Sequence, residues 1–198
     1  MGMIPSFSFQ CPPKVLFGWG EATRVGQEAR QLGGKKALVI TDPMVAKMGP
    51  AETVTKSLQE AGLEVDVFAS VKPEPPVETL EECVTFVRQN KVDLLVGVGG
   101  GSSLDITKAT AVIAANSDSV ECYLTGGAPE KRGLPRILIP TTAGTGSEVT
   151  CGAVITDAEL NIKKGLVNPL LYADIAIVDP EFTVSMPPNV TASTGIDV

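Results

Sequence analysis

The segment best suited to ligand chemistry is a run of three glycines and two serines at positions 99–103. It directly follows an apolar run at 94–98, and a helical pattern continues from it to about residue 115. Glycines let a ligand approach the backbone, and a helix N-terminus offers unpaired N–H groups and a positive dipole end. The run therefore favours a phosphate-binding turn, with a plain strand-to-helix turn capped by Ser102 or Ser103 as the alternative. It does not fit GxGxxG, because the third glycine is missing, and Asp105 could simply complement the helix dipole.

Two other apolar runs end in polar side chains. Asp42 follows the run 37–41, where an acidic residue can hydrogen-bond the ribose of a dinucleotide and repel a 2′-phosphate. The alternative is a structural role, because Asp-Pro is a common turn pair. The run 136–140 leads into a loop rich in hydroxyl groups, which suits binding of an amide, ribose or phosphate, or simple capping of the loop. The hydroxyl residues are Thr141, Thr142, Thr145, Ser147 and Thr150.

Short apolar runs alternate with helical patterns along the chain and must position these segments. The continuous runs are typical of strands buried on both faces. The alternation predicts an α/β fold: a doubly wound, mostly parallel sheet flanked by helices, with an N-terminal strand and a second sheet-edge segment. Strands are expected at 14–17, 37–41, 65–68, 94–98, 136–140, 153–157 and 175–179, and helices at 21–32, 51–61, 77–90, 102–115, 120–124 and from Pro187 onward.

Composition excludes several kinds of function. The 198 residues include 16 Lys and Arg, 23 Asp and Glu, and no histidine, which gives a net charge of −7. Without histidine the chain holds no Ser–His–Asp triad, no histidine general base and no histidine metal ligand. The negative charge argues against nucleic acid as a partner. No signal peptide or apolar stretch of about 18 residues is visible, so no membrane partner is expected. Four dispersed cysteines indicate reduced core residues and a cytoplasmic location.

Three segments occur in a characteristic order: GGGSSLDITKA, then LPRILIPTTAGTGSEVT, then IVDPEFTVSMPPNVTASTGID. In this order they resemble the iron-containing (group III) alcohol dehydrogenase family. The resemblance covers essentially the whole chain, including the opening FGWGE. It implies an α/β dinucleotide-binding domain related to dehydroquinate synthase, followed by an all-helical metal-binding domain. It also implies reversible hydride transfer between an alcohol and NAD(P), with divalent iron or zinc.

The resemblance implies a role for each matching residue. Asp42 matches the acidic residue that favours NAD over NADP, and Lys163 matches a lysine that reaches the cofactor ribose. Asp197 matches the family's metal-ligating aspartate, but the family's histidines find no match in this chain. Glu74 departs from the family, since many relatives have asparagine there, near the adenosine. The pyrophosphate loop is matched by Gly100, Gly101 and Ser102, with Asp105 nearby, and the positions around the phosphate and nicotinamide by Thr141, Thr142, Thr145 and Thr150.

We therefore expect residues 1–190 to form a dinucleotide-binding domain and residues 191–198 to be the stub of a missing helical metal-binding domain. The expected function is that of an NAD-binding domain in an oxidoreductase that acts on a small alcohol or aldehyde, within a homo-oligomer. The chain alone is expected to be inactive, because one carboxylate cannot hold a catalytic metal against water. The alternatives are a non-catalytic NAD-binding fragment, a dehydroquinate synthase-like lyase, or a structural module without a ligand.

Overall fold

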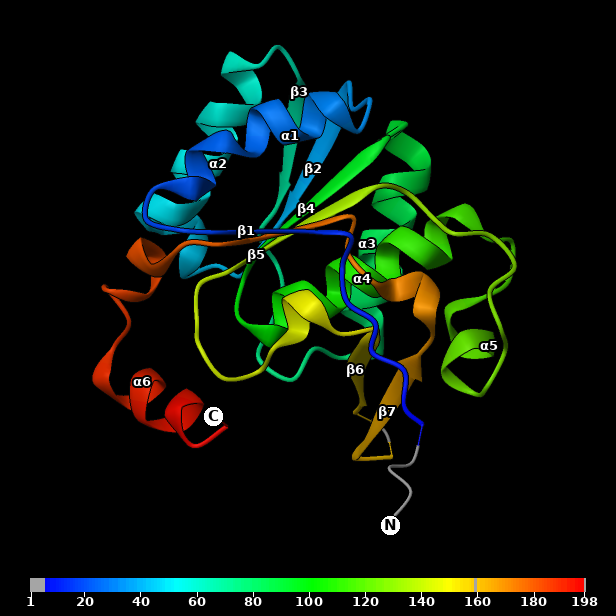
Figure 1. Ribbon diagram of the computed structural model, residues 1–198. Coiled ribbons are helices and arrows are strands. Elements are labelled where there is room, and N and C mark those ends of the chain that lie inside the picture. Colours follow the sequence, from blue (N-terminus) through cyan, green and yellow to red (C-terminus); the bar gives the residue numbers. More distant parts are fainter. Residues whose placement is uncertain (1–5, 159, 198) are drawn as a thin grey trace.

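A six-stranded parallel sheet organises the structure, a computed structural model that describes residues 6–158 and 160–197. The strand order is β1-β8-β5-β4-β2-β3, and every pairing is parallel (Figure 1). This confirms the expected α/β class with its mostly parallel sheet. The strands are β1 (Lys14–Phe17), β2 (Lys36–Ile40), β3 (Glu64–Phe68), β4 (Leu94–Gly99), β5 (Arg136–Pro140) and β8 (Ile175–Val178).

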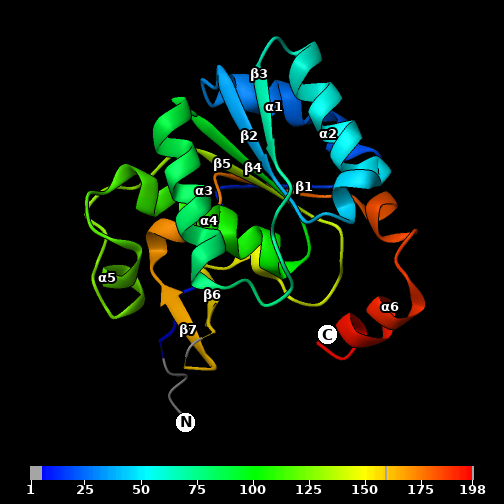
Figure 2. The ribbon, with the colours of Figure 1, turned by 180° about the vertical axis from the view of Figure 1, so that it is seen from behind.

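Helices cover both faces of this sheet, as the doubly wound pattern requires. Alternate residues of β2 point to opposite faces: Ala37 and Val39 pack in the core beneath α1 and α2, whereas Leu38 and Ile40 pack beneath α3 and α4. Figure 2 shows α3 and α4 in front of the sheet when the molecule is seen from behind. The helices are α1 (Val25–Gln31), α2 (Gly49–Glu60), α3 (Val77–Asn90), α4 (Gly101–Ala115), α5 (Val120–Leu124) and α6 (Pro188–Gly195).

The helix α4 is buried almost all round. Ten of its fifteen residues are buried, and they include Thr107 and Lys108 as well as apolar side chains. An α-helix with so little exposed surface must lie inside the protein rather than on it. Here α4 lies between the sheet on one side and α3 and the β6–β7 hairpin on the other. Its N-terminus is thereby held firmly at the end of β4.

The second sheet segment is a separate antiparallel hairpin of β6 (Gly152–Asp157) and β7 (Ile162–Val167). The expected strand at 153–157 is present, but its partner β7 was not predicted from the sequence. The helix expected at 21–32 also differs, because its first turn is a 3-10 helix (Glu21–Arg24) that leads into α1. The remaining predicted elements are confirmed to within two residues at each end. No helix among the described residues is long and apolar enough to span a membrane.

The order of the strands places a crevice at the carboxyl ends of the neighbouring strands β2 and β4. From β2 the chain moves outward to β3, then returns to the other side of β2 to form β4, and continues through β5 to β8. The loops that follow β2 and β4 consequently diverge in opposite directions. The aspartate and the glycine run singled out in the sequence follow these two strands, so the fold brings them together at the point of divergence.

Asp179 follows β8 and binds the backbone that follows the neighbouring strand β1. Replacing it tests this part of the fold. Its buried carboxylate accepts hydrogen bonds from the backbone N–H groups of Gly20 at 3.1 Å, Ala22 at 3.0 Å and Glu181 at 3.1 Å. We predict that Asp179→Ala lowers the free energy of unfolding by about 2–3 kcal/mol, because buried N–H groups lose a charged acceptor. Urea unfolding measures this. Glu60→Ala, at an exposed position on α2, should change it by less than about 0.5 kcal/mol, and an equally small effect of Asp179→Ala would contradict the prediction.

Candidate functional site

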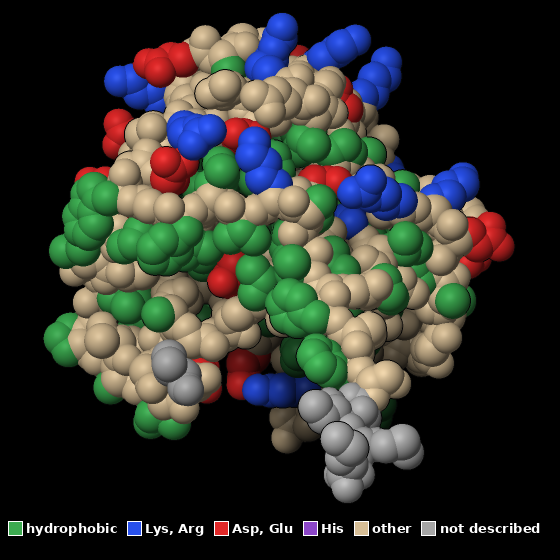
Figure 3. Space-filling view, viewed as in Figure 1, with side chains coloured by type: hydrophobic (Ala, Val, Ile, Leu, Met, Phe, Trp, Pro, Cys, Tyr) green, Lys and Arg blue, Asp and Glu red, His purple; other side chains and the backbone are tan. Residues whose placement is uncertain are grey.

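A cleft of 740 Å³ opens at the carboxyl ends of β2, β4 and β5. A second cavity of 510 Å³ adjoins it on the side of the β6–β7 hairpin. In the space-filling view the surface is hollowed between the α6 side and the hairpin side of the molecule (Figure 3). Five residues line both cavities and mark their common boundary: Glu74, Gly101, Ser102, Thr145 and Asp197.

The turn between β4 and α4 forms one wall of the cleft, and it has no room for side chains. Gly99 has a φ of +148°, and a Cβ on it would lie 2.7 Å from Ser103 Oγ and 3.4 Å from Asp42 Oδ2. Gly100 is the residue that caps α4, and no side chain accepts a hydrogen bond from its first turn. The alternative with Ser102 or Ser103 as the capping side chain is therefore wrong. The start of α4 faces the cleft with backbone rather than with a side-chain cap.

Asp42 lies opposite this turn, at the end of β2, and it is half-buried. Its Oδ1 accepts hydrogen bonds from the N–H groups of Met44 at 2.8 Å and Val45 at 2.9 Å. The structural role that the Asp-Pro pair suggested is thus present. It leaves the other oxygen, Oδ2, on the side of Gly99. One carboxylate can accordingly hold its own turn and still present an acceptor to a ligand.

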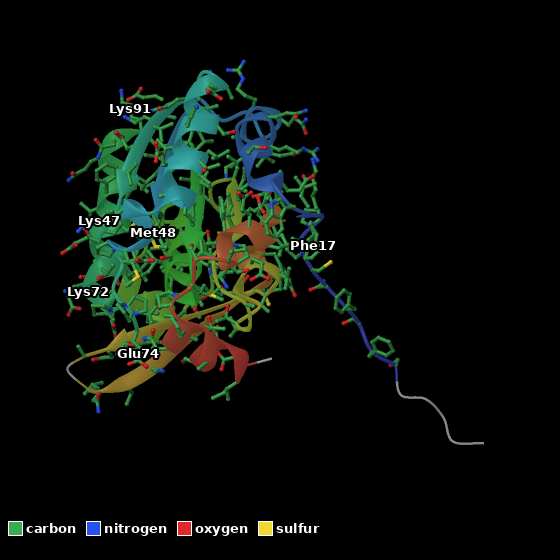
Figure 4. The ribbon with its side chains drawn as sticks, turned by 90° about the vertical axis from the view of Figure 1, so that its left-hand side faces the viewer. Phe17, Lys47, Met48, Lys72, Glu74 and Lys91 are labelled. Carbon is green, nitrogen blue, oxygen red and sulfur yellow. The ribbon has the colours of Figure 1, made fainter. Side chains whose placement is uncertain are left out.

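The turn that Asp42 holds makes the apolar end of the cleft. Met44, Val45 and Met48 line it from the segment after β2, and Val71 and Lys72 line it from the segment after β3. Figure 4 shows Met48, Lys72 and Glu74 following one another along this side toward the hairpin. Methionines are flexible and polarisable, so they suit a flat ring of low polarity.

The hydroxyl-rich loop after β5 packs directly on the glycine turn. Thr141 is buried, and its N–H group donates to the carbonyl of Gly99 at 3.0 Å. A Cβ on Gly100 would lie 3.4 Å from Thr142 Oγ1, and the Cβ of any residue at Gly101 would lie 3.2 Å from Thr145 Cγ2. The structure therefore brings Thr141, Thr142 and Thr145 to the predicted pyrophosphate loop. Thr150 lies farther along, where it lines the second cavity.

Asp105 lines the second cavity, and both of its carboxylate oxygens accept hydrogen bonds from the protein. Its Oδ1 accepts from Ser147 Oγ at 2.7 Å and lies 2.9 Å from Lys108 Nζ, while its Oδ2 accepts from the N–H of Val154 at 2.9 Å. Lys108 was not predicted as a site residue, because a lysine in a helical pattern usually faces solvent. Its spacing of three residues from Asp105 was the available signal. Burial lowers the pKa of Lys108, and the carboxylate of Asp105 opposes that shift.

Lys163 lies on β7 and reaches across the mouth of the second cavity to Glu74. Its Nζ is 2.7 Å from Glu74 Oε1, and both side chains are more than half exposed. Glu74 has a φ of +49°, a left-handed conformation in which asparagine is far more common than glutamate. The structure thus pairs Glu74, a departure from the family pattern, with the lysine that the resemblance assigned to the cofactor ribose.

Asp197 is exposed and borders both cavities. A Cβ on Gly144 would lie 2.3 Å from the carbonyl oxygen of Thr194 and 3.0 Å from Asp197 Cβ, so the loop after β5 touches the α6 segment closely. Among the described residues, no three cysteine, aspartate or glutamate side chains gather where they could hold a metal, and the sequence has no histidine. One carboxylate does not fit a catalytic metal, so no chemical step through a metal follows from these residues.

Comparison with known proteins places this geometry in a family. The model of the family described as "Iron-containing alcohol dehydrogenase" matches residues 12–180. Long-chain-alcohol dehydrogenase 1 of Geobacillus thermodenitrificans is 52% identical over 190 residues, 94% of this chain and 47% of that protein. The NAD-dependent methanol dehydrogenase of Bacillus methanolicus is 40% identical over 190 residues, 96% of this chain and 50% of that protein.

Solved structures agree. Sulfoacetaldehyde reductase from Bifidobacterium kashiwanohense, in complex with NAD+, superimposes with a TM-score of 0.90 at 37% identity and covers 99% of this chain and 51% of its own. NADH-dependent butanol dehydrogenase A from Thermotoga maritima gives a TM-score of 0.91 at 30% identity, over 97% of this chain and 48% of its own. The chain thus spans about half the length of the relatives it matches. On the family match and these likenesses, the chain belongs to the iron-containing alcohol dehydrogenase family.

Proposed function

We propose that the cleft binds NAD, and that the chain is the cofactor-binding part of an enzyme that transfers hydride between a small alcohol or aldehyde and NAD. The observation that carries the proposal is the meeting of Asp42 with the glycine turn 99–101 where the sheet reverses its order. Dinucleotides bind at such reversals in open α/β sheets. The NAD dependence named for the methanol dehydrogenase and the NAD+ complex of the sulfoacetaldehyde reductase support this choice of cofactor.

We propose a place in the cleft for each part of the cofactor, on the basis of the residues that line it. The adenine lies against Met44, Met48 and Val71, and its ribose hydroxyls donate to Asp42 Oδ2. The pyrophosphate lies on the backbone N–H groups of Gly101 and Ser102, at the positive end of the α4 dipole. The nicotinamide half then extends toward the second cavity along the hydroxyl-rich loop after β5, residues 141–150, here called the threonine loop. The other proposed cofactor contacts are Gly100, Thr141, Thr142, Thr145, Thr150 and Lys163.

In this arrangement the chain's residues bind and orient the cofactor, and the nicotinamide ring supplies the hydride chemistry when bound. We place Asp197 as the single metal-ligating residue of this chain. We also propose that residues 1–190 form the cofactor domain and that residues 191–198 begin the metal-binding one; α6 spans this boundary. A homo-oligomer, a cytoplasmic location and a small alcohol or aldehyde substrate stay predictions.

A non-catalytic NAD-binding fragment is the second candidate for the chain in isolation. The lack of a metal-binding cluster among the described residues favours it. The lyase alternative has less support, because the matching family is one of alcohol dehydrogenases.

Asp42 should set the choice between the two cofactors. We predict that the chain binds NAD at least tenfold more tightly than NADP, about 1.4 kcal/mol, because a 2′-phosphate would approach the carboxylate. Asp42→Asn should reduce this ratio to about threefold or less, since asparagine keeps an acceptor for Met44 and Val45 but loses the charge. Isothermal titration calorimetry measures both ratios. Equal binding of NAD and NADP by the wild-type chain, or no binding of either, would overturn the proposal.

Gly101 should be essential for binding of the pyrophosphate. We predict that Gly101→Val weakens NAD binding by at least about tenfold, because its Cβ would lie 3.2 Å from Thr145 Cγ2 and its side chain would take up space in the cleft that Gly101 lines. Gly165→Val is the control, since Gly165 is exposed on β7, lines neither cavity and has open space around its Cβ position. Unchanged NAD binding by a folded Gly101→Val variant would mean that the glycine run is only a turn.

The isolated chain should not turn over an alcohol. We predict no steady NADH formation from a small primary alcohol and NAD, with or without added iron or zinc, because the described residues offer no set of metal ligands. Absorbance at the NADH band measures this, with a complete relative assayed in parallel as the positive control. Steady turnover by the purified 198-residue chain would refute the argument from the missing ligands.

A further inference from the structure

We propose that Lys108 and Asp105 are positioning residues, which hold the threonine loop against α4 so that its far end can receive the nicotinamide half of the cofactor. This inference rests on the proposed NAD site. It gives Asp105 a different role from the direct cofactor contact that the resemblance implied. It also gives a role to a buried lysine that cofactor binding leaves unexplained.

The ammonium group of Lys108 has no hydrogen-bonding capacity left for a ligand. Its three protons have three acceptors: Asp105 Oδ1 at 2.9 Å, the carbonyl of Ser147 at 2.9 Å, and the carbonyl of Gly152. The side chain is 0% exposed. Lys108 can therefore influence a ligand only through the residues that it holds.

The two carbonyls are well placed for this purpose. Ser147 begins the 3-10 turn η3 (Ser147–Val149), and Gly152 begins β6. Thr150 lies between these two fixed points and lines the second cavity, as does Thr145 just before them. One side chain from α4 thus binds both ends of the short segment 147–152, which carries Thr150 and directly follows Thr145.

Asp105 completes the attachment. It accepts from the side chain of Ser147 and from the backbone of Val154, so it binds the loop and β6 at two further points. Both of its oxygens thus accept from this segment, although Asp105 also lines the second cavity. Because Asp105 and Lys108 lie one turn apart on a helix that begins at the glycine turn, the pyrophosphate site and the nicotinamide-side loop share one rigid support.

This arrangement predicts a split between the two halves of the cofactor. The adenosine site is built from the segments after β2 and β3. The side chains of Lys108 and Asp105 instead join α4 to the loop and strand of residues 147–154. A loosened loop should consequently weaken NAD but leave AMP almost unaffected. If the ion pair only stabilised the fold, its removal would lower the apparent affinities for NAD and AMP equally, through loss of folded protein.

The experiment compares Lys108→Met with wild type and with Lys56→Met, which removes the same charge at an exposed position on α2. NAD and AMP affinities are measured by NMR titration, and amide hydrogen exchange of residues 145–154 is measured without ligand. We expect Lys108→Met to weaken NAD by at least about tenfold and AMP by less than twofold. Exchange in 145–154 should quicken while β4 and β5 stay protected. Lys56→Met should match wild type in all three.

Two results would overturn the inference: unchanged NAD affinity in a folded Lys108→Met variant, or equal loss of AMP and NAD affinity. If that variant does not fold, Ser147→Ala decides, since it removes only the hydroxyl that donates to Asp105. It should weaken NAD about twofold to fivefold without affecting AMP, and no change or an equal change would again overturn the inference. Failure of the wild-type chain to bind NAD would instead refute the proposed function, while hydrogen exchange would still report whether the pair holds the loop.

Discussion

The site depends on the close packing of the glycine turn at residues 99–101 against the residues around it. At the end of β4, Gly99 leaves room for Ser103 and Asp42, and Gly101 leaves room for Thr145. The absence of Cβ atoms at these positions lets the loops after β2, β4 and β5 pack closely on the turn. A residue with a side chain at Gly99 would also be strained, since its φ of +148° suits glycine. The shape of the cleft thus depends on the absence of side chains in this turn.

A second constraint follows from the burial of α4. A helix enclosed on all sides cannot shift without disturbing the sheet, α3 and the hairpin together, which makes its N-terminus a fixed point for a phosphate. Enclosure also makes a buried charge on the helix costly unless it finds a partner inside the protein. Lys108 meets this requirement by binding the loop that lines the cleft. The need to satisfy a buried charge and the need to fix a ligand-binding loop therefore have the same solution here.

Much of this fold could be predicted from the sequence, for identifiable physical reasons. Strands β2, β4 and β5 are continuous apolar runs because both of their faces are covered, and such runs are easily recognised. Strand β7 was missed because Lys163, Lys164 and Gly165 interrupt its apolar residues in a hairpin that is exposed on one side. The role of Lys108 was missed because its type favours solvent, and only the contacts of the folded chain show where its charge is satisfied. For Asp42 the sequence offered a turn residue and a ribose-binding residue as alternatives. Only the structure shows that one oxygen holds the turn while the other stays on the side of Gly99, so that both roles are compatible.

The same loop also connects the cofactor cleft to Asp197. Gly144 lets the carbonyl of Thr194 approach so closely that any side chain there would collide with it. The loop after β5 thus touches the α6 segment at a point three residues before Ser147, where Asp105 binds the same loop. Asp197 is exposed and borders both cavities, so the proposed metal-ligating residue lies at the end of the proposed nicotinamide site. Hydride transfer requires the reacting carbon and the nicotinamide to be within contact distance. On the proposed function, the ion pair on α4 would serve this requirement by holding residues 147–154, beside which we place the nicotinamide half of the cofactor.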